Sequence, residues 1–277
     1  MGVAPGFVVN GCNSLSTGGT SEDFNNLTYT ASLSHRWSDN ISTYASYSTG
    51  YKSGGFTGRT TAFQPAQTPL PFDEETARTI EVGAKTDFEN LRLNIAAFTT
   101  SFEDLQLIIQ QGVAPVTTNA ADATINGIEA EAQFSPADGL NFTAAIGILD
   151  AGYDDPPPFP IGEKLQNAPS FTGNFGADYT FDVNNIGSVT MRTDYTHKST
   201  VYNNSENTAL LVQDPVDLLN ASITWTHKGD QFSVTAGGTN LTNERELITG
   251  FFQPGVGYTE GVFNREAEWY LQASFKY

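Results

Sequence analysis

The side chains that could do catalytic chemistry in this chain are few and far apart. The three histidines, His35, His197 and His227, lack the i,i+4 or clustered spacing of a metal site, and serines accompany them by composition alone. The single cysteine, Cys12, excludes a disulfide framework and any cysteine-built metal centre, so we interpret it as an incidental free thiol. We therefore predict no catalytic and no metal-binding residue, and a hydrolase acting through one histidine is only an alternative.

Two other patterns resemble binding motifs. The segment Gly50–Gly55 contains glycines and a Lys-Ser pair, but no obvious helix follows whose N-terminus would hold a phosphate. We interpret it as a flexible strand exit. Acidic runs at Asp73–Glu75, Asp154-Asp155 and Glu244–Glu246 offer oxygen ligands for divalent cations. Because these runs lack a recognisable ligand spacing, we expect a solvated acidic rim instead.

The composition favours a β protein and argues against a nucleic-acid partner. The formal net charge is −18, from 13 Lys and Arg against 31 Asp and Glu. Only 16% of the 277 residues are charged, while Gly, Thr, Ser, Asn and aromatic residues are frequent. No stretch approaches the roughly 18–20 apolar residues of a membrane-spanning helix, which excludes a helical membrane protein.

Hydrophobic alternation with a period of two residues recurs from Leu27 to the C-terminus and predicts β-strands. The pattern gives about eleven strands, most with the ~9–11 residues that a tilted membrane strand requires. The predicted strands are Leu27–Trp37, Ile41–Tyr51, Thr76–Phe88, Leu91–Leu107, Ile125–Phe134, Leu140–Ile148, Phe171–Phe181, Val189–Tyr195, Leu219–Trp225, Phe232–Ala236 and Phe263–Tyr277.

The connections between these strands alternate between short and long. Short turns of turn-forming residues are predicted at 38–40, 89–90, 136–139, 184–187 and 228–230. Long segments fall between them, at 52–75, 108–121, 150–168, 200–214 and 245–262. This alternation is typical of an outer-membrane barrel, which has tight periplasmic turns and extended outer loops.

The two faces of the predicted strands also fit a barrel in lipid. One face of the strand at Leu91 carries Leu93 and Ile95, whereas Arg92 and Asn94 point the other way. A closed sheet in lipid needs apolar side chains on its outer face. Aromatic residues near strand ends fit interfacial girdles, and these are Trp37, Tyr51, Phe181, Tyr195, Trp225, Trp269 and Tyr277.

Several segments resemble TonB-dependent outer-membrane receptors. The longest are Ile41–Arg59 (ISTYASYSTGYKSGGFTGR) and Phe72–Leu107 (FDEETARTIEVGAKTDFENLRLNIAAFTTSFEDLQL). Shorter matches are Ile125–Phe134 (INGIEAEAQF), Gly237–Arg245 (GGTNLTNER) and the C-terminal ASFKY. The resemblance covers nearly all of Leu27–Tyr277 in the family's order, and the GYKSGGF segment is most similar to the iron-complex, or siderophore, receptor branch.

The resemblance implies an all-β fold, an antiparallel transmembrane β-barrel. Receptors of this family resemble a barrel of about 22 strands with a plug in its lumen, so the strands seen here correspond to the C-terminal half without the plug. We expect residues 1–26 to form an outer loop with an irregular start, and residues 27–277 to form the C-terminal part of the barrel. Eleven strands would leave two open edges in lipid, and Met1 opens no signal peptide, so we expect a fragment.

The resemblance also suggests where a ligand is captured, at the outer loops and the mouth of the lumen. Aromatic side chains offer rigid contact area there, and Arg or Lys offers charge to an anionic chelate. The candidate ligand-binding residues are Tyr51, Lys52, Arg59, Tyr153, Tyr202, Phe251, Phe252, Tyr258 and Arg265.

Two further sets of residues have expected roles in the barrel. Charged residues on the polar face would line the lumen and face the plug, and these are Arg92, Glu129, Glu131, Arg192, Asp194, Glu266 and Glu268. A wet barrel interior would account for them equally well. The alternating C-terminal residues resemble the signal that the barrel-assembly machinery reads, and these are Leu271, Ala273, Phe275 and Tyr277.

We therefore expect a segment of a receptor in the outer membrane of a Gram-negative bacterium, which takes up a ferric siderophore or a similar scarce ligand. The resemblance implies as partners the outer-membrane lipid, the missing plug and N-terminal barrel half, a TonB-type energy-transducing complex acting through the plug, and the barrel-assembly machinery. No cofactor is expected, because iron enters only as part of the transported chelate. The alternative is a complete small barrel that serves as a passive pore or a structural protein.

Overall fold

The computed structural model describes residues 21–57, 71–111, 114–155 and 161–276. Of the residues singled out above, Cys12, Arg59 and Tyr277 lie outside these ranges. One antiparallel sheet of 11 strands dominates the described chain, and its strands lie side by side in chain order. These strands are β1 (Thr30–Ser38), β2 (Ile41–Lys52), β5 (Glu75–Asp87), β6 (Leu91–Gln111), β7 (Ala114–Ala137), β8 (Leu140–Tyr153), β9 (Phe171–Val183), β10 (Gly187–Lys198), β13 (Val216–His227), β14 (Phe232–Thr239) and β17 (Glu268–Phe275).

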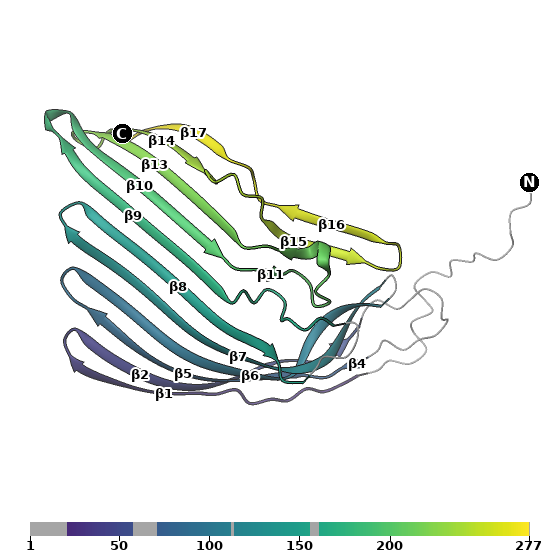
Figure 1. Cartoon of the computed structure of the whole chain (residues 1–277). Coiled ribbons are helices and arrows are strands. Elements are labelled where there is room, and N and C mark those ends of the chain that lie inside the picture. The colour runs from purple at the N-terminus through teal and green to yellow at the C-terminus, as the bar shows by residue number, and fades with distance from the viewer. Residues whose placement is uncertain (1–20, 58–70, 112–113, 156–160, 277) are drawn as a thin grey trace, which may run out of the picture.

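Each of the eleven predicted strands is confirmed, and so is the antiparallel sheet. The sheet curves strongly without closing, so β1 and β17 form its two edges (Figure 1). The short turns all lie at one end of the sheet, at the left of Figure 1, and the long segments lie at the opposite end. The alternation of short and long connections in the sequence thus corresponds to two different ends of one sheet.

Several predicted boundaries are wrong by a few residues, such as the end of β8 at Tyr153 instead of Ile148, and two further differences affect the cap. Residues 108–121 were expected to be a loop, but β6 and β7 continue pairing through Ile109–Val116 to Gln111–Ala114. These strands have 21 and 24 residues, more than a membrane crossing needs, and the far part of the hairpin is held by other loops that bury Ile109 and Val116. At the C-terminal end, β17 begins at Glu268 and not at Phe263, because residues 264–267 connect two separate sheets.

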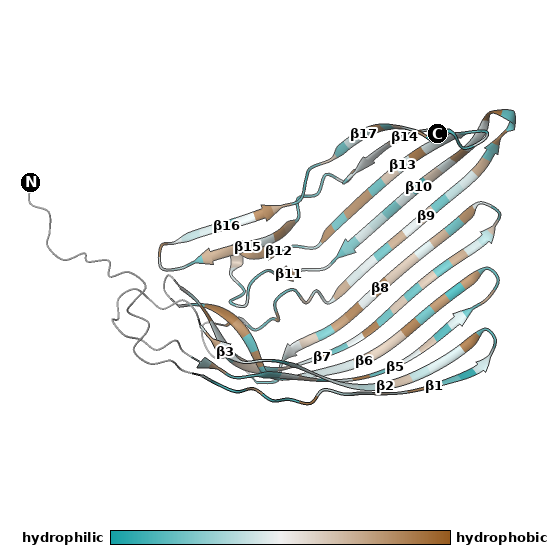
Figure 2. Cartoon of the chain, turned by 180° about the vertical axis from the view of Figure 1, so that it is seen from behind, coloured by the Kyte–Doolittle hydropathy of each residue, from teal (hydrophilic) through white to brown (hydrophobic). Residues whose placement is uncertain are grey.

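The strand register gives the sheet one polar and one apolar face. Residues paired across antiparallel strands share a face, and successive residues alternate between faces. One continuous row of the polar face is Arg36, Ser42, Lys85, Asn94, Glu131, Ala145, Asn174 and Thr196. The row beside it on the apolar face is Thr86, Leu93, Ala132, Ala144, Phe175, Tyr195 and Leu219. Figure 2 shows the resulting alternation of polar and apolar bands along the strands.

Many large apolar side chains on the apolar face are exposed. Ile80, Ile95, Ile128, Ile148 and Ile223 are each between 43% and 53% exposed. Soluble proteins rarely leave so large a continuous apolar surface uncovered, so this face is suited to a hydrocarbon solvent. Helix contributes little to the described ranges: the 3-10 turns η2 (Asn184–Ile186) and η3 (Ala209–Leu211) are single turns, and no described helix has the length and apolar character needed to cross a membrane.

The buried core lies at the loop end of the molecule, among the long connections and the far part of the β6–β7 hairpin. We call this part the cap and define it as residues 53–57, 71–74, 103–123, 161–170, 199–216 and 240–267. It includes three small two-stranded sheets: β3 (Gly55–Phe56) with β4 (Pro71–Phe72), β11 (Val201–Tyr202) with β12 (Val212–Gln213), and β15 (Leu247–Gln253) with β16 (Tyr258–Phe263). Among the described residues, every buried apolar or polar side chain belongs to the cap. The largest that are almost fully buried are Leu211 and Val216, at 1% and 2% exposure.

Candidate functional site

The cap encloses a cavity of about 680 Å³, formed where four long connections meet. The far part of the β6–β7 hairpin forms one wall, with Gln106 and Gln110 among its lining residues. Residues 203–206, between β11 and η3, form a second wall. Lys52 and Phe72 line it at the β2–β5 connection, and β15 adds Phe251 and Phe252. A volume of this size is in the range of small-molecule sites.

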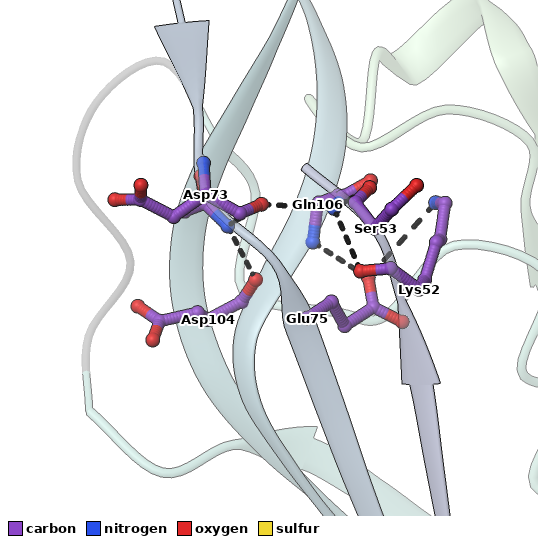
Figure 3. Close-up of polar contacts among 7 residues, drawn as sticks. Lys52, Ser53, Asp73, Glu75, Asp104 and Gln106 are labelled. Carbon is purple, nitrogen blue, oxygen red and sulfur yellow. Dashed lines mark hydrogen bonds and ion pairs between the residues drawn. The ribbon is translucent and has the colours of Figure 1, made fainter. Parts of the chain in front are cut away.

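Gln106 fixes the β2–β5 connection against the β6–β7 hairpin (Figure 3). Its side-chain Nε2 donates to the backbone oxygens of Ser53 at 3.1 Å and Asp73 at 2.9 Å, and its backbone N–H donates to Glu75 Oε2 at 2.8 Å. Asn119 adds a second clamp, accepting from the backbone N–H of Asp73 at 2.7 Å and donating to its oxygen at 3.0 Å. The buried side chain of Gln106 therefore holds the floor of the cavity in place.

A bulge directs the β6–β7 hairpin into this position. The register between the two strands shifts on both sides of Leu105, and Asp104 adopts a positive φ of 55°. An extra residue in one strand bends it locally. The backbone N–H of Asp104 is satisfied by Asp122 Oδ1 at 2.9 Å across the hairpin. The bulge thus marks the point where the barrel strands end and the cap begins.

The wall at 203–206 is tied to the same hairpin. Glu206 Oε1 accepts the backbone N–H of Gln110 at 2.8 Å, and the Ser205 hydroxyl donates to the Ile108 oxygen at 2.7 Å. Asn204 Nδ2 donates to Glu206 Oε2 at 2.8 Å, so the carboxylate is held from both sides. These contacts join segments that are almost one hundred residues apart in the sequence.

The β15–β16 hairpin is clamped at its base by asparagines. Asn240 Nδ2 donates to the backbone oxygens of Glu244 at 2.8 Å and Arg265 at 2.9 Å, and its Oδ1 accepts the Glu244 N–H at 3.0 Å. Asn264 repeats this role, accepting the Glu246 N–H at 2.9 Å. The segment GGTNLTNER therefore has a structural function. Its first asparagine, Asn240, holds together the two ends of the connection that carries Phe251 and Phe252.

Two ion pairs lie at the boundary between the sheet and the cap. The Lys52 ammonium lies 4.0 Å from Glu75 Oε2, and the Lys198 ammonium lies 2.5 Å from Glu246 Oε1. Glu246 is only 6% exposed, so the expectation of a solvated acidic rim is wrong for this residue. At the hairpin, the Tyr258 hydroxyl donates to Glu260 Oε2 at 2.5 Å, which raises the pKa of Tyr258 above its usual value.

The structure brings three of the predicted ligand-binding residues together. Lys52, Phe251 and Phe252 all line the cap cavity, although about 200 residues separate the first from the others. Tyr51 precedes Lys52 in β2 and therefore points to the opposite face of the sheet. The role of these three residues in ligand binding remains a prediction.

The remaining predicted ligand-binding residues lie apart from the cavity. Tyr153 ends β8, where its hydroxyl is buried and has no hydrogen-bond partner in the described part of the chain. Tyr202 lies in β11, and Tyr258 lies in β16 with 48% exposure. Arg265 forms an ion pair with Glu268 at 3.3 Å.

Six of the predicted lumen residues share the polar face of the sheet, and these are Arg92, Glu129, Glu131, Arg192, Asp194 and Glu268. Glu266 lies in the connection 264–267, where no strand register assigns it to a face. Arg92 pairs with Asp87 at 3.3 Å, and Arg192 pairs with Asp194 at 2.9 Å. The predicted assembly residues Leu271, Ala273 and Phe275 lie on the apolar face of the edge strand β17.

The cavity also contains polar residues that the sequence reasoning missed. These are chiefly carboxamides, and they include Gln106, Gln110, Gln166, Asn203 and Asn204. Aromatic and cationic residues stand out as ligand contacts in a sequence, whereas Asn and Gln occur in every loop of this chain. Only the way the connections fold together distinguishes these five.

The described residues offer no clear catalytic arrangement. No group of three or more His, Cys, Asp or Glu side chains in the described ranges is placed to hold a metal ion. His197 Nδ1 lies 2.6 Å from Asp217 Oδ1, and the Tyr195 hydroxyl donates to the same oxygen at 2.5 Å. These three side chains belong to the apolar face of the sheet, away from the polar face.

Comparison with known proteins identifies the origin of this architecture. A family model described as TonB dependent receptor-like, beta-barrel, matches residues 7–241. The ferric yersiniabactin uptake receptor FyuA from Yersinia pestis superimposes with a TM-score of 0.75 at 19% identity, over 88% of this chain and 36% of that one. The ferric preacinetobactin receptor BauA from Acinetobacter baumannii gives 0.66 at 19% identity, over 89% and 35%.

A third solved structure with the same fold, the copper transporter OprC, gives a TM-score of 0.66 at 13% identity, over 89% of this chain and 38% of that one. At these identities the likeness shows the fold alone. The chain spans about a third of the length of the solved structures that it matches.

Proposed function

Because this chain belongs to the TonB dependent receptor-like β-barrel family, we propose that it forms part of an outer-membrane receptor for the energised uptake of a scarce ligand, a ferric siderophore or a similar chelate. The observation that carries this proposal is the cap cavity, where Lys52, Phe251 and Phe252 meet at the loop end of the sheet. The names of the similar structures support a metal chelate as cargo, since FyuA and BauA are ferric-siderophore receptors.

Uptake by this receptor would require partners. The proposed partners are a plug domain inside the barrel, the barrel strands that complete the sheet, and a TonB-type complex that transmits energy through the plug. The barrel-assembly machinery would insert the strands into outer-membrane lipid. Iron is treated as cargo within the chelate, so no resident cofactor is proposed.

The polar face of the sheet has side chains suited to contact with a plug domain. Charged side chains such as Glu129, Glu131 and Arg192 offer hydrogen bonds and ion pairs to a domain in the lumen. A plug held by polar contacts can rearrange with water entering the interface, whereas an apolar core would have to be broken. This property suits a receptor that must open and close.

The proposal is tested by iron uptake in cells that carry or lack the gene. Cells are supplied with ⁵⁵Fe as a ferric trihydroxamate, a ferric tris-catecholate or ferric citrate, with and without a protonophore. We expect deletion of the gene to abolish uptake of at least one chelate, the intact gene to restore it, and the protonophore to abolish it again. Uptake that continues in de-energised cells would instead indicate a passive pore.

Substitutions in the cavity test whether chelate uptake depends on the cap. Replacing Phe251 and Phe252 together by alanine should lower chelate uptake about tenfold, because aromatic contacts dominate binding at such sites. The matched control is Tyr270→Ala, an aromatic residue on the polar face of β17 that does not line the cavity. Equal losses in the two variants would contradict the assignment of the cavity as the capture site.

A further inference from the structure

Resting on the proposed function, we infer that the cap cavity accepts a neutral or positively charged chelate whose periphery carries N–H or O–H donors, and that it discriminates against polyanionic chelates. The cavity offers the ligand few donors and one cation, and it presents acceptor atoms within an acidic surrounding.

The amide donors of the cavity are largely used by the protein itself. Gln106 Nε2 donates to backbone oxygens of Ser53 and Asp73. Asn204 Nδ2 donates to Glu206 Oε2 and to the Thr208 hydroxyl, both at 2.8 Å. Because a carbonyl or carboxylate oxygen only accepts, these contacts also fix which end of each amide is nitrogen. An anionic ligand would therefore find these donors occupied.

An acceptor, by contrast, remains without a partner. Gln110 Oε1 is buried and has no hydrogen-bond partner in the described part of the chain. A buried acceptor without a donor costs free energy, which a ligand N–H or O–H would recover. Gln110 lines the cavity, and its backbone N–H is already donated to Glu206. Because less than 1 Å² of this oxygen is exposed, the Gln110 side chain must turn toward the cavity for a ligand donor to reach it, and a ligand that brings a donor is then favoured at this atom.

Among the residues that the structure describes, Lys52 is the only cationic side chain that lines the cavity. Its ammonium is 61% exposed and 4.0 Å from the carboxylate of Glu75, so the pair carries no net positive charge. Glu206 adds a carboxylate to the opposite wall. An anionic chelate would meet a lysine that already has a carboxylate beside it, and a glutamate that has no cationic partner among the described residues.

The charge of the surrounding cap also disfavours an anionic chelate. In the described cap segments acidic side chains greatly outnumber basic ones, which are Lys164, Arg245 and Arg265. Arg265 is paired with Glu268, and Arg245 lies over the Phe263 ring at 4.1 Å from its centroid. An excess of acidic side chains around a site concentrates cationic ligands near it and repels anionic ones.

The test compares three ⁵⁵Fe-labelled probes that differ in charge: a ferric trihydroxamate carrying a free ammonium, a neutral ferric trihydroxamate and a trianionic ferric tris-catecholate. Binding is measured on native outer-membrane vesicles from cells that produce the protein, against vesicles from the deletion strain. We expect the first two probes to bind at least tenfold more tightly than the third. The preference for the cationic probe should shrink as salt rises, because ions screen the acidic mouth.

Two cavity variants test whether the preference among the probes arises in the cavity. Gln110→Leu should weaken binding of the neutral probe about fivefold, the cost of one hydrogen bond, while Gln272→Leu, on the polar face of β17, should not. Lys52→Met should raise the affinity for the cationic probe about threefold by removing a like charge. Both cavity variants are compared at equal outer-membrane levels, measured by heat-modifiable mobility in gels.

The outcomes separate this inference from the function on which it rests. Tightest binding of the trianionic probe, or a loss of affinity for the cationic probe in Lys52→Met, would overturn the inference and leave chelate uptake standing. Absence of specific retention for all three probes, together with unchanged iron uptake on gene deletion, would overturn the proposed function and the inference with it.

Discussion

Ile95 and Asn94 are neighbours in β6 that face different solvents. Ile95 is 43% exposed on the apolar face, in register with Ala84 and Ala130, whereas Asn94 is in register with Lys85 and Glu131. At the residue scale, the identity of a strand side chain is therefore set by which face it occupies. Moving a side chain by one position along the strand places it on the other face, where the opposite polarity is needed.

This difference predicts unequal costs for the same substitution. Ile95→Arg should lower the free energy of unfolding by about 2–4 kcal/mol, because the guanidinium would enter hydrocarbon near the middle of the barrel wall. Asn94→Arg should cost less than about 1 kcal/mol, since it replaces one polar group by another. Urea titration of the protein in lipid bilayers measures both, and equal penalties would mean that the faces are assigned wrongly.

A second residue-scale prediction concerns Gln106. Gln106→Leu removes the donor that the oxygens of Ser53 and Asp73 share. The Asp73 oxygen keeps its bond from Asn119, whereas the Ser53 oxygen loses this partner, at a cost of about 1–3 kcal/mol. The β2–β5 connection should then detach from the β6–β7 hairpin. Protease added to intact cells should cleave the variant faster within residues 53–74, whereas Gln133→Leu on the polar face should be cleaved like the wild type.

At the scale of the element, hydrogen bonds from asparagine side chains hold the two ends of the β15–β16 connection together. Asn240→Ala removes four hydrogen bonds at the base of β15–β16, those with Thr242, Glu244 N–H, Glu244 oxygen and Arg265. It also strains a position with φ of 49°, which asparagine tolerates better than alanine.

The Asn240→Ala variant should therefore expose the β15–β16 connection to external protease and reduce chelate binding, with little change in the stability of the sheet. Val256→Ala, at an exposed position in the turn of the same hairpin, serves as the control. Unfolding of the whole barrel at lower urea in Asn240→Ala would contradict this local role.

The edge strand β17 supports a prediction about assembly. Deleting residues 275–277 removes Phe275, which pairs with Phe232 and ends the alternating apolar pattern. The amount of protein in the outer membrane should fall severalfold, because the resemblance makes this segment the signal for insertion. Deleting 255–257 from the β15–β16 turn is the matched control, and equal levels of the two deletion proteins would refute the assignment.

The elements were predictable to different degrees. The strand from Leu91 was visible because its side chains alternate between two solvents, and this pattern is local. The pairing of Ile108 with Thr117 was missed, because nothing within that segment reveals that Ile109 and Val116 are buried by other connections. Residue type predicts Lys52 and Phe252 as ligand contacts, which stays a prediction. That they line one cavity with Gln110 depends on contacts between segments distant in the sequence.

At the scale of the whole molecule, the sheet and the cap are stabilised in different ways. The sheet joins neighbouring strands through backbone hydrogen bonds and leaves its apolar face exposed, while the cap buries side chains such as Leu211 in the manner of a small soluble domain. The two outermost strands, β1 and β17, use only one of their edges within the eleven-stranded sheet. At an open edge in lipid, backbone N–H and C=O groups would have no hydrogen-bond partner, because water cannot reach them.

We therefore expect the outer edges of β1 and β17 to be paired with further strands in the membrane. Hydrogen exchange measured by mass spectrometry on outer-membrane vesicles should show amides of β1 exchanging as slowly as those of β8, at the centre of the sheet. The exposed turn at residues 38–40 provides a fast-exchanging internal reference. Rapid exchange in β1 would mean that this edge is open to water.

The order of the strands has a consequence for how such a chain can change over generations. Because each strand pairs only with its neighbours in sequence, a hairpin can be duplicated, lost or exchanged with another gene without re-pairing the rest of the sheet. The cap opposes this freedom, since the cavity assembles Lys52, Gln110, Glu206 and Phe252 from hairpins spread over most of the chain. A recombination breakpoint anywhere between the first and last of these residues would preserve the wall of the barrel and divide the proposed binding site.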